Sequence, residues 1–180
     1  MKKQLGIVVL ALLLVVSMSY GQSAYKMGDR VLSAGIGLGA LAGGYGDNTL
    51  PALSIGLDYG YNENISFGGI VGIAGSEFRY SGGYGWDYTY IIIGGRGAYH
   101  FLDLFKDSKI DSYAGLTVGY NIVSWKEVGT PVGVTYSASG SYLIYGLHAG
   151  LRYYFNDKLA VQGEIGYGLG LLNLGIAYKL

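Results

Sequence analysis

The sequence predicts an all-β fold, namely an eight-stranded, antiparallel, up-and-down transmembrane β-barrel. Three observations support this fold: an export signal, a period-two hydrophobic pattern that recurs to the last residue, and connections that alternate between short and long. The pattern is clearest in the last segment, residues 171–180, where leucine, isoleucine and tyrosine alternate with small or polar residues. One uniformly apolar face opposite a glycine-bearing and polar face favours lipid as the outer solvent.

The N-terminus predicts a secretory signal peptide over residues 1–21, followed by a barrel domain over residues 22–180. Lys2 and Lys3 precede an apolar run over residues 5–16, and Ser19 and Gly21 supply the small residues of a cleavage site. The alternative is an uncleaved membrane anchor, but the run is shorter than the ~20 residues of a spanning helix. We therefore expect export from the cytoplasm.

Composition excludes several classes of protein. The chain has no cysteine, which excludes disulfides, thiolate metal sites and lipid anchoring through an N-terminal cysteine. It has 12 basic and 12 acidic residues, only 13% charged in total, and no basic stripe of the kind that binds nucleic acid. The mean hydropathy is +0.32, with 33 glycines and 19 tyrosines.

After the signal peptide, no apolar run has the length of a membrane-spanning helix. A membrane protein without such helices must close its strands into a barrel, because lipid offers no partner for free backbone groups. The alternating segments are residues 32–42, 52–61, 65–78, 88–101, 111–124, 141–155, 159–167 and 171–180. In the third segment Ile70 and Phe78 fall on the face opposite Phe67, Val71 and Ile73, which leaves its register open.

The connections and the aromatic residues indicate how the barrel is oriented. We expect short periplasmic turns at residues 62–64, 102–109 and 156–158, and long external loops at residues 43–50, 77–87 and 125–140. Aromatic residues at the segment ends predict two girdles at the membrane interfaces. The inner girdle is Tyr59, Tyr61, Tyr99, Phe101, Tyr153, Phe155 and Tyr178, and the outer is Tyr80, Tyr84, Trp86, Tyr88, Trp125 and Tyr136.

Nearly every charge within the segments lies on the glycine-bearing face. This is the reverse of a soluble lipocalin, the main alternative, which buries its apolar face and exposes its charges. Asp58, Arg96, Arg152 and Glu164 all fall on inward faces in the periplasmic half. Because isolated buried charges are strongly unfavourable, we expect a structural ionic cluster in the lumen, with Glu164 in contact with Arg152.

No catalytic, cofactor-binding or metal site is predicted. Residues 35–40 match a GxGxxA dinucleotide pattern, but that motif needs a strand followed by a helix, and here the glycines alternate within a strand. The two histidines, His100 and His148, point inward, whereas Ser139 and Ser141 stand toward the outer rim. A nucleophilic serine must lie within reach of its base, so these residues do not predict a hydrolase.

The chain resembles the small outer-membrane barrel family related to OmpX and the OmpA membrane domain, in particular its Bacteroidota versions. The similar stretches are Tyr99-His100-Phe101, Asp111-Ser112-Tyr113-Ala114-Gly115-Leu116, Gly119-Tyr120-Asn121, and residues 150–155 and 174–180. The resemblance implies an outer-membrane location and insertion by the barrel-assembly machinery, which usually reads a terminal aromatic residue. Leu180 departs from that pattern.

The expected function is a structural or surface-interaction role of a monomer surrounded by outer-membrane lipid. Loops rich in tyrosine, glycine and serine suit adhesion to an external protein or glycan. Two alternatives remain open: a narrow channel for ions or small solutes, and a lipid-modifying enzyme. No cofactor and no nucleic-acid partner are expected.

Overall fold

The structure, a computed structural model, describes residues 24–39, 47–80, 84–101, 109–129, 136–166 and 170–180. The expected signal peptide lies outside these residues, as do residues 40–46, where part of the first predicted strand and loop fell. The strands are β1 (Arg30–Leu38), β2 (Asp47–Gly60), β3 (Ile65–Arg79), β4 (Gly85–His100), β5 (Ile110–Val128), β6 (Ser137–Tyr154), β7 (Leu159–Gly166) and β8 (Leu172–Lys179).

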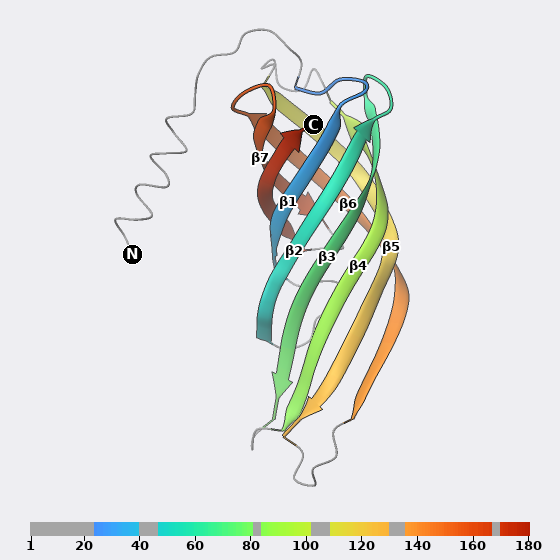
Figure 1. Cartoon of the computed structure of the whole chain (residues 1–180), viewed down its shortest axis with the longest axis vertical. Helices are drawn as coiled ribbons and strands as arrows, with labels where there is room; N and C mark the ends of the chain where they lie inside the picture. The colour runs from blue at the N-terminus through green and yellow to red at the C-terminus, as the bar shows by residue number, and fades with distance from the viewer. Residues whose placement is uncertain (1–23, 40–46, 81–83, 102–108, 130–135, 167–169) are drawn as a thin grey trace, which may run out of the picture.

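The eight strands form a closed barrel in which each strand pairs antiparallel with its sequence neighbours (Figure 1). Closure comes from β1 and β8, which pair from Val31↔Lys179 to Leu38↔Leu172. The predicted fold class is therefore confirmed. In the described part of the chain, no helix is long and apolar enough to cross a membrane.

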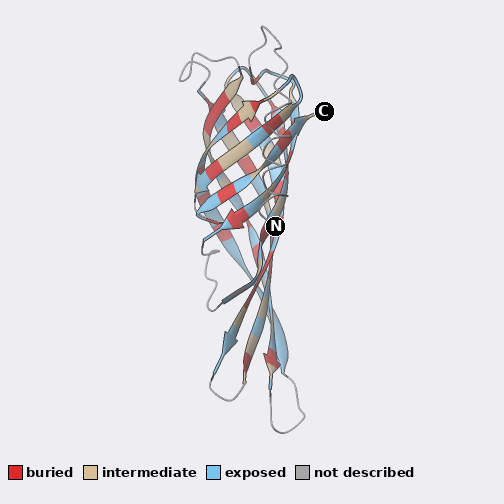
Figure 2. Cartoon of the chain, turned by 90° about the vertical axis from the view of Figure 1, so that its left-hand side faces the viewer, coloured by how far each residue is buried: buried red, intermediate tan, exposed pale blue. Residues whose placement is uncertain are grey.

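The two faces of each membrane-spanning strand differ as the sequence predicts (Figure 2). Outward side chains such as Ile55 and Ile165 are each 62% exposed to the surroundings, whereas inward Arg152 is 1% exposed. The register of β3, which the sequence left open, places Phe67 and Val71 outward and buries Ile70 in the lumen. The outward apolar rows are the surface that meets lipid.

Two of the turns expected on the periplasmic side are closed by the same side-chain interaction. Oδ1 of Asn62 accepts hydrogen bonds from the backbone N–H groups of Asn64 and Ile65, both at 2.8 Å. Oδ1 of Asn156 likewise accepts from the N–H groups of residues 158 and 159. Asparagine stabilises such turns because its short side chain bonds the backbone two or three residues ahead. Both turns match the prediction.

At the outer end the strands are longer than predicted. Residues expected in loops continue the ladder: β3 pairs with β4 as far as Arg79↔Gly85, and β5 pairs with β6 as far as Lys126↔Ser137. We call this extension the external sheet; it comprises residues 74–79, 85–90, 123–128 and 137–142 of β3 to β6. Figure 2 shows it as a narrow, twisted projection from the barrel.

Reversed side-chain polarity explains why these extensions were missed. Within the barrel the outward residues are apolar, as in Ile91 and Ile93 of β4. Two residues further out the same face becomes polar, with Thr89 and then Asp87. The corresponding polar residues are Glu77 and Arg79 on β3, Ser124 and Lys126 on β5, and Ser137, Ser139 and Ser141 on β6. The change marks the level at which water replaces lipid outside the barrel.

The predicted outer aromatic girdle is partly wrong. Trp86, Tyr88 and Trp125 lie on the face of the external sheet that continues the lumen wall. Each is an even number of residues from an inward-facing residue of its own strand, Arg96 on β4 or Tyr113 on β5. They therefore do not face lipid.

Candidate functional site

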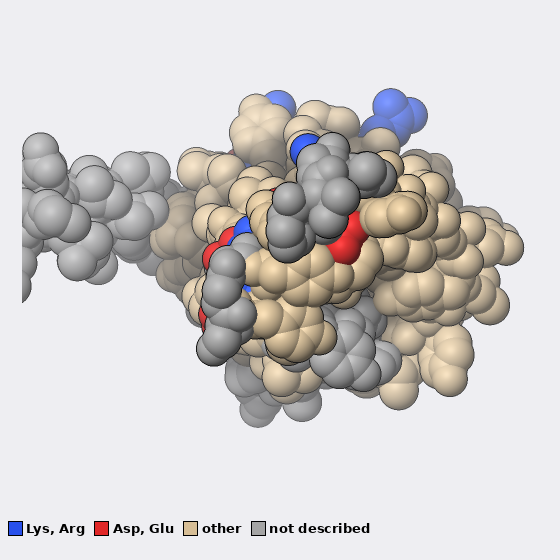
Figure 3. All heavy atoms as spheres, turned by 90° about the horizontal axis from the view of Figure 1, so that it is seen from below, with Lys and Arg blue, Asp and Glu red and all other residues tan. Residues whose placement is uncertain are grey.

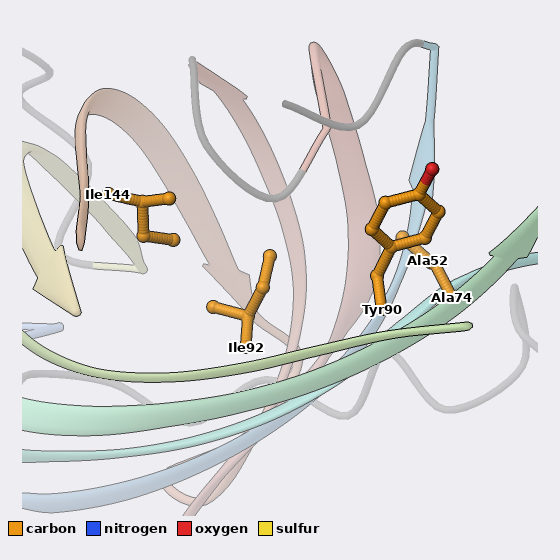
Figure 4. Close-up of a cluster of buried hydrophobic side chains, with 5 residues drawn as sticks. All are labelled: Ala52, Ala74, Tyr90, Ile92 and Ile144. Atoms are coloured by element: carbon orange, nitrogen blue, oxygen red, sulfur yellow. The ribbon is translucent and has the colours of Figure 1, made fainter. Parts of the chain in front are cut away.

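The outer half of the lumen contains an apolar layer. Tyr90 and Ile92 of β4 meet Ile144 of β6, Ala52 and Ala74, all of them buried (Figure 4). An eight-stranded barrel has room inside only for side chains. The apolar layer therefore occupies part of the outer half of the lumen.

The inner half of the lumen contains the four charged residues that the sequence singled out. Arg96 Nη2 lies 2.7 Å from Glu164 Oε2, and Arg96 Nε lies 3.5 Å from Asp58 Oδ1. Arg152 Nη2 lies 2.6 Å from Asp58 Oδ2. The carboxylate of Glu164 thus pairs with Arg96, and the expected contact with Arg152 is replaced by the bond of Arg152 to Asp58.

Three further residues complete this network, and sequence reasoning did not include them. Arg152 also donates from Nε to Gln162 Oε1 at 2.9 Å and approaches Asp111 Oδ2 at 3.5 Å. The guanidinium of Arg152 lies 4.6 Å above the ring of Tyr113, whose hydroxyl donates to Glu164 at 3.0 Å. In the sequence, the only indication for these three residues was that the alternation of β5 and β7 places them on the inward face.

Inward glycines make room for these large side chains. A Cβ atom added at Gly150 would collide with the ring of Tyr113, and one added at Gly68 would collide with the carboxylate of Asp58. The inward face is therefore rich in glycine because the lumen must also hold the large side chains of arginine, tyrosine and the acidic residues.

A serine–histidine–aspartate arrangement lies near the inner end of the lumen, below the ionic cluster. Ser66 Oγ is 2.9 Å from His100 Nε2, and His100 Nδ1 is 2.6 Å from Asp111 Oδ1. This is the bonding order of a nucleophile, its base and an orienting carboxylate. Ser66 was missed because only Ser139 and Ser141 were weighed against the histidines.

Tyr25 covers this arrangement. Its ring stacks on the ring of His100, with centroids 3.6 Å apart and planes 7° apart. Its hydroxyl lies within hydrogen-bond distance of two carbonyl oxygens, those of Ile65 at 2.7 Å and Asn62 at 3.0 Å. Burial, reinforced by the charge of Asp111, raises the pKa of Tyr25 to about 12, so the phenol remains a neutral donor. The segment before β1 thus places the Tyr25 side chain in the inner end of the barrel.

The outer part of β6 forms an open edge of the external sheet. Even-numbered residues direct their backbone toward β5, since Tyr154 N–H donates to Lys109 and the Tyr136 carbonyl accepts from Glu127. The odd-numbered residues Ser137, Ser139 and Ser141 therefore direct N–H and C=O away from β5. No described strand pairs with them, because the β6–β7 ladder begins at His148.

On the opposite side, the outer part of β2 pairs with β3 beside the external sheet, and this flanking strand is protected. The outer part of β2 contains Pro51, which has no N–H, and its pairing with β3 is shifted between Asn48 and Leu53. Proline and irregular pairing are the usual means by which an edge strand avoids association. Residues 137–143 of β6 contain neither a proline nor a charge.

The described residues include no group of three or more histidine, cysteine, aspartate or glutamate side chains that could hold a metal ion.

Comparison with known proteins identifies the fold. No protein-family model matches the sequence, and no curated protein matches it. Among solved structures, Neisserial surface protein A matches with a TM-score of 0.55 and 16% identity over 84% of this chain and 95% of that chain. The N-terminal barrel domain of Pseudomonas aeruginosa OprF matches with a TM-score of 0.54 and 11% identity over 87% and 100% of the two chains.

A third match is Ail, the attachment invasion locus protein of Yersinia pestis, solved in complex with the heparin analogue sucrose octasulfate. Its TM-score is 0.53, with 15% identity over 85% of this chain and 98% of that chain. These matches confirm, at the level of the fold, the resemblance found in the sequence. The chain therefore has the fold of the small eight-stranded β-barrels of bacterial outer membranes.

Proposed function

We propose that this barrel is a surface-interaction protein of the outer membrane that binds external proteins by accepting a β-strand on the free edge of β6. The observation that carries the proposal is the edge itself, where the odd-numbered serines at 137, 139 and 141 present backbone groups with no described partner. A free edge without proline or charge is a template for an added strand.

The closed lumen supports an external role. The apolar layer and the ionic cluster lie one above the other across the barrel, so the space inside is occupied by side chains. We therefore favour binding at the surface over the channel alternative. The barrel then serves as an anchor that holds the external sheet away from the membrane.

A catalytic role for Ser66 is not part of the proposal. Ser66, His100 and Asp111 are all buried, and Tyr25 lies flat on the imidazole. A substrate would have to displace the segment before β1 to reach the serine. We infer that these three residues form a structural hydrogen-bond chain that ties β3, β4 and β5 together below the ionic cluster.

A sulfated ligand like that of Ail is not favoured here. Within the external sheet, the cations Arg79 and Lys126 are accompanied by the carboxylates Glu77, Asp87 and Glu127. Arg79 forms ion pairs with both Glu77 and Asp87. This balance offers no concentrated positive charge to an anionic partner.

The experiment that tests strand addition compares Ser139→Pro with Ser139→Ala. Proline removes one edge N–H but leaves the β5 ladder intact, because that ladder uses residues 138 and 140. The mature protein in lipid nanodiscs would be passed over immobilised β-sandwich domains, which carry exposed edge strands. We expect about tenfold weaker binding for Ser139→Pro, since a lost hydrogen bond and a steric block together weaken pairing by about 1.4 kcal/mol. Equal binding of the two variants would refute the proposal.

A further inference from the structure

The external sheet also contains a groove walled by aromatic rings, on the face that continues the lumen wall. The groove has a volume of about 510 Å³ and is lined by Trp86 and Tyr88 of β4, Trp125 of β5, and Tyr142 of β6. This volume is within the range of small-ligand sites, ~300–1,000 Å³. Gly140 leaves space in the groove beside the indole of Trp125, because glycine has no side chain.

The rings form an elongated platform. Tyr88 lies directly opposite Trp125 in the β4–β5 ladder, and the rings of Tyr88 and Tyr90 are nearly parallel, with planes 18° apart and centroids separated by 6.3 Å. Because the rings are spread over three adjacent strands, they do not enclose a small, compact ligand. They suit an extended ligand with successive flat, apolar faces, as the C–H faces of pyranose rings provide.

Two buried acceptors bracket this platform along β5. Asn121 is 1% exposed; its Nδ2 donates to Tyr142 Oη at 2.8 Å, while its Oδ1 has no hydrogen-bond partner in the described structure. Glu127 is 7% exposed; its Oε1 accepts from Tyr84 at 2.6 Å, while its Oε2 also lacks a described partner. Neither residue lines the groove and both free oxygens are covered, so a ligand hydroxyl group would donate to them only after the neighbouring Tyr142 or Tyr84 side chain moves aside.

Charge restricts the ligand further. No lysine or arginine lines the groove, and the described surface at this end of the molecule shows few charged side chains (Figure 3). The free carboxylate oxygen of Glu127 disfavours sulfated or phosphorylated sugars. An uncharged sugar chain combines the apolar faces that the rings need with the hydroxyl donors that the two acceptors need.

We propose that this groove binds an uncharged oligosaccharide presented from outside the cell. Sugars of the surrounding membrane would meet the opposite, polar face of the sheet, at Asp87, Thr89 and Lys126, since that face continues the lipid-facing wall of the barrel. The groove adjoins the β6 edge at Ser141, which lines it, but the two sites use different groups. The groove uses side chains on one face of the sheet, whereas strand addition uses backbone groups at the rim.

Tryptophan fluorescence tests the proposal directly, because Trp86 and Trp125 are the two tryptophans of the whole chain. The mature protein in lauryldimethylamine oxide, a detergent without a sugar headgroup, would be titrated with maltohexaose, chitohexaose, a heparin hexasaccharide and choline. We expect a saturable change with at least one uncharged hexasaccharide, and none with heparin or choline. The proposal would be overturned if neither uncharged sugar changed the tryptophan fluorescence, or if only heparin or choline gave a saturable change.

A second variant separates binding from folding. A Cβ atom at Gly140 would lie 3.8 Å from the Trp125 ring, an ordinary contact, so Gly140→Val places methyl groups in the groove beside this ring. We expect it to weaken binding at least tenfold while preserving heat-modifiable gel mobility. Ser124→Ala, on the polar face beside Trp125, is the matched control and should bind normally. Unchanged affinity of a folded Gly140→Val protein would overturn the assignment.

Discussion

Replacing Glu164 with leucine should destabilise the barrel by leaving Arg96 without its closest counter-ion. The Arg96 guanidinium is buried, and its Nη2 lies 2.7 Å from Glu164. Its other carboxylate, Asp58, is 3.5 Å away and is already bonded to Arg152 at 2.6 Å. Breaking a buried ion pair by removing one partner costs about 3–5 kcal/mol. We expect Glu164→Leu to lower the free energy of unfolding by about this amount.

The second half of the prediction is recovery. Adding Arg96→Leu removes the stranded charge, so the double variant should be more stable than the sum of the single changes by about 1–3 kcal/mol. Adding Arg152→Leu instead should give nearly additive losses, because Arg152 pairs with Asp58 and Gln162. Arg79→Leu in the external sheet is the distant control and should be additive.

Urea unfolding in lipid vesicles measures these free energies, with the folded fraction followed by heat-modifiable gel mobility and by circular dichroism. Additivity of Glu164→Leu and Arg96→Leu to within about 0.5 kcal/mol would refute the pairing. Stronger coupling of Glu164 to Arg152 than to Arg96 would refute the register that brings β4 and β7 together across the lumen.

Three further predictions follow from the same structure. Leu174→Arg should reduce the folded fraction on gels more than Leu174→Ala, because arginine facing mid-membrane lipid costs ~2–4 kcal/mol; equal folding would contradict the lipid-facing assignment. In planar bilayers the mature protein should show no steady porin-like current, and reproducible ion-selective channels altered by Arg96→Leu would contradict the closed lumen. A fluorophosphonate probe should leave Ser66 unlabelled beneath Tyr25, whereas labelling detected by peptide mass spectrometry would reopen the enzyme alternative.

The membrane-spanning part of the fold could be predicted because a strand between lipid and a narrow lumen has one simple rule. Outward residues must be apolar, and inward residues are small or polar, so the period-two pattern assigns each side chain to a face. Asp58 and Arg152 could be placed in the lumen on this basis alone. β3 was ambiguous because Ile70, an apolar residue, points inward.

The contacts inside the lumen could not be predicted in the same way. The period-two alternation shows which face of a strand a residue occupies. Its partner across the barrel depends on strand tilt and stagger, which the alternation does not encode. Arg96 and Glu164 are 68 residues apart and lie on β4 and β7. Ser66 escaped notice for the same reason, because nothing near it in the sequence indicates His100 or Asp111.

The external strand ends were missed because the rule itself changes there. Beyond the membrane the outer face meets water, so Thr89 and Ser124 replace Ile91 and Ile122 while the backbone pairing continues. A search for apolar outward residues stops at that level and assigns a loop. The reversal is informative once recognised, since it locates the outer edge of the lipid on β4 and β5.

In the proposed function, the barrel anchors the protein and the external sheet carries recognition. Two neighbouring residues of β6 serve the two proposed binding modes through different groups. Ser139 presents its N–H and C=O at the free edge, whereas Gly140 lies at the aromatic groove and directs its backbone to β5. Proline at 139 should therefore weaken strand addition and leave sugar binding intact, and valine at 140 should do the reverse. Loss of both activities in either variant would mean that one surface serves a single partner.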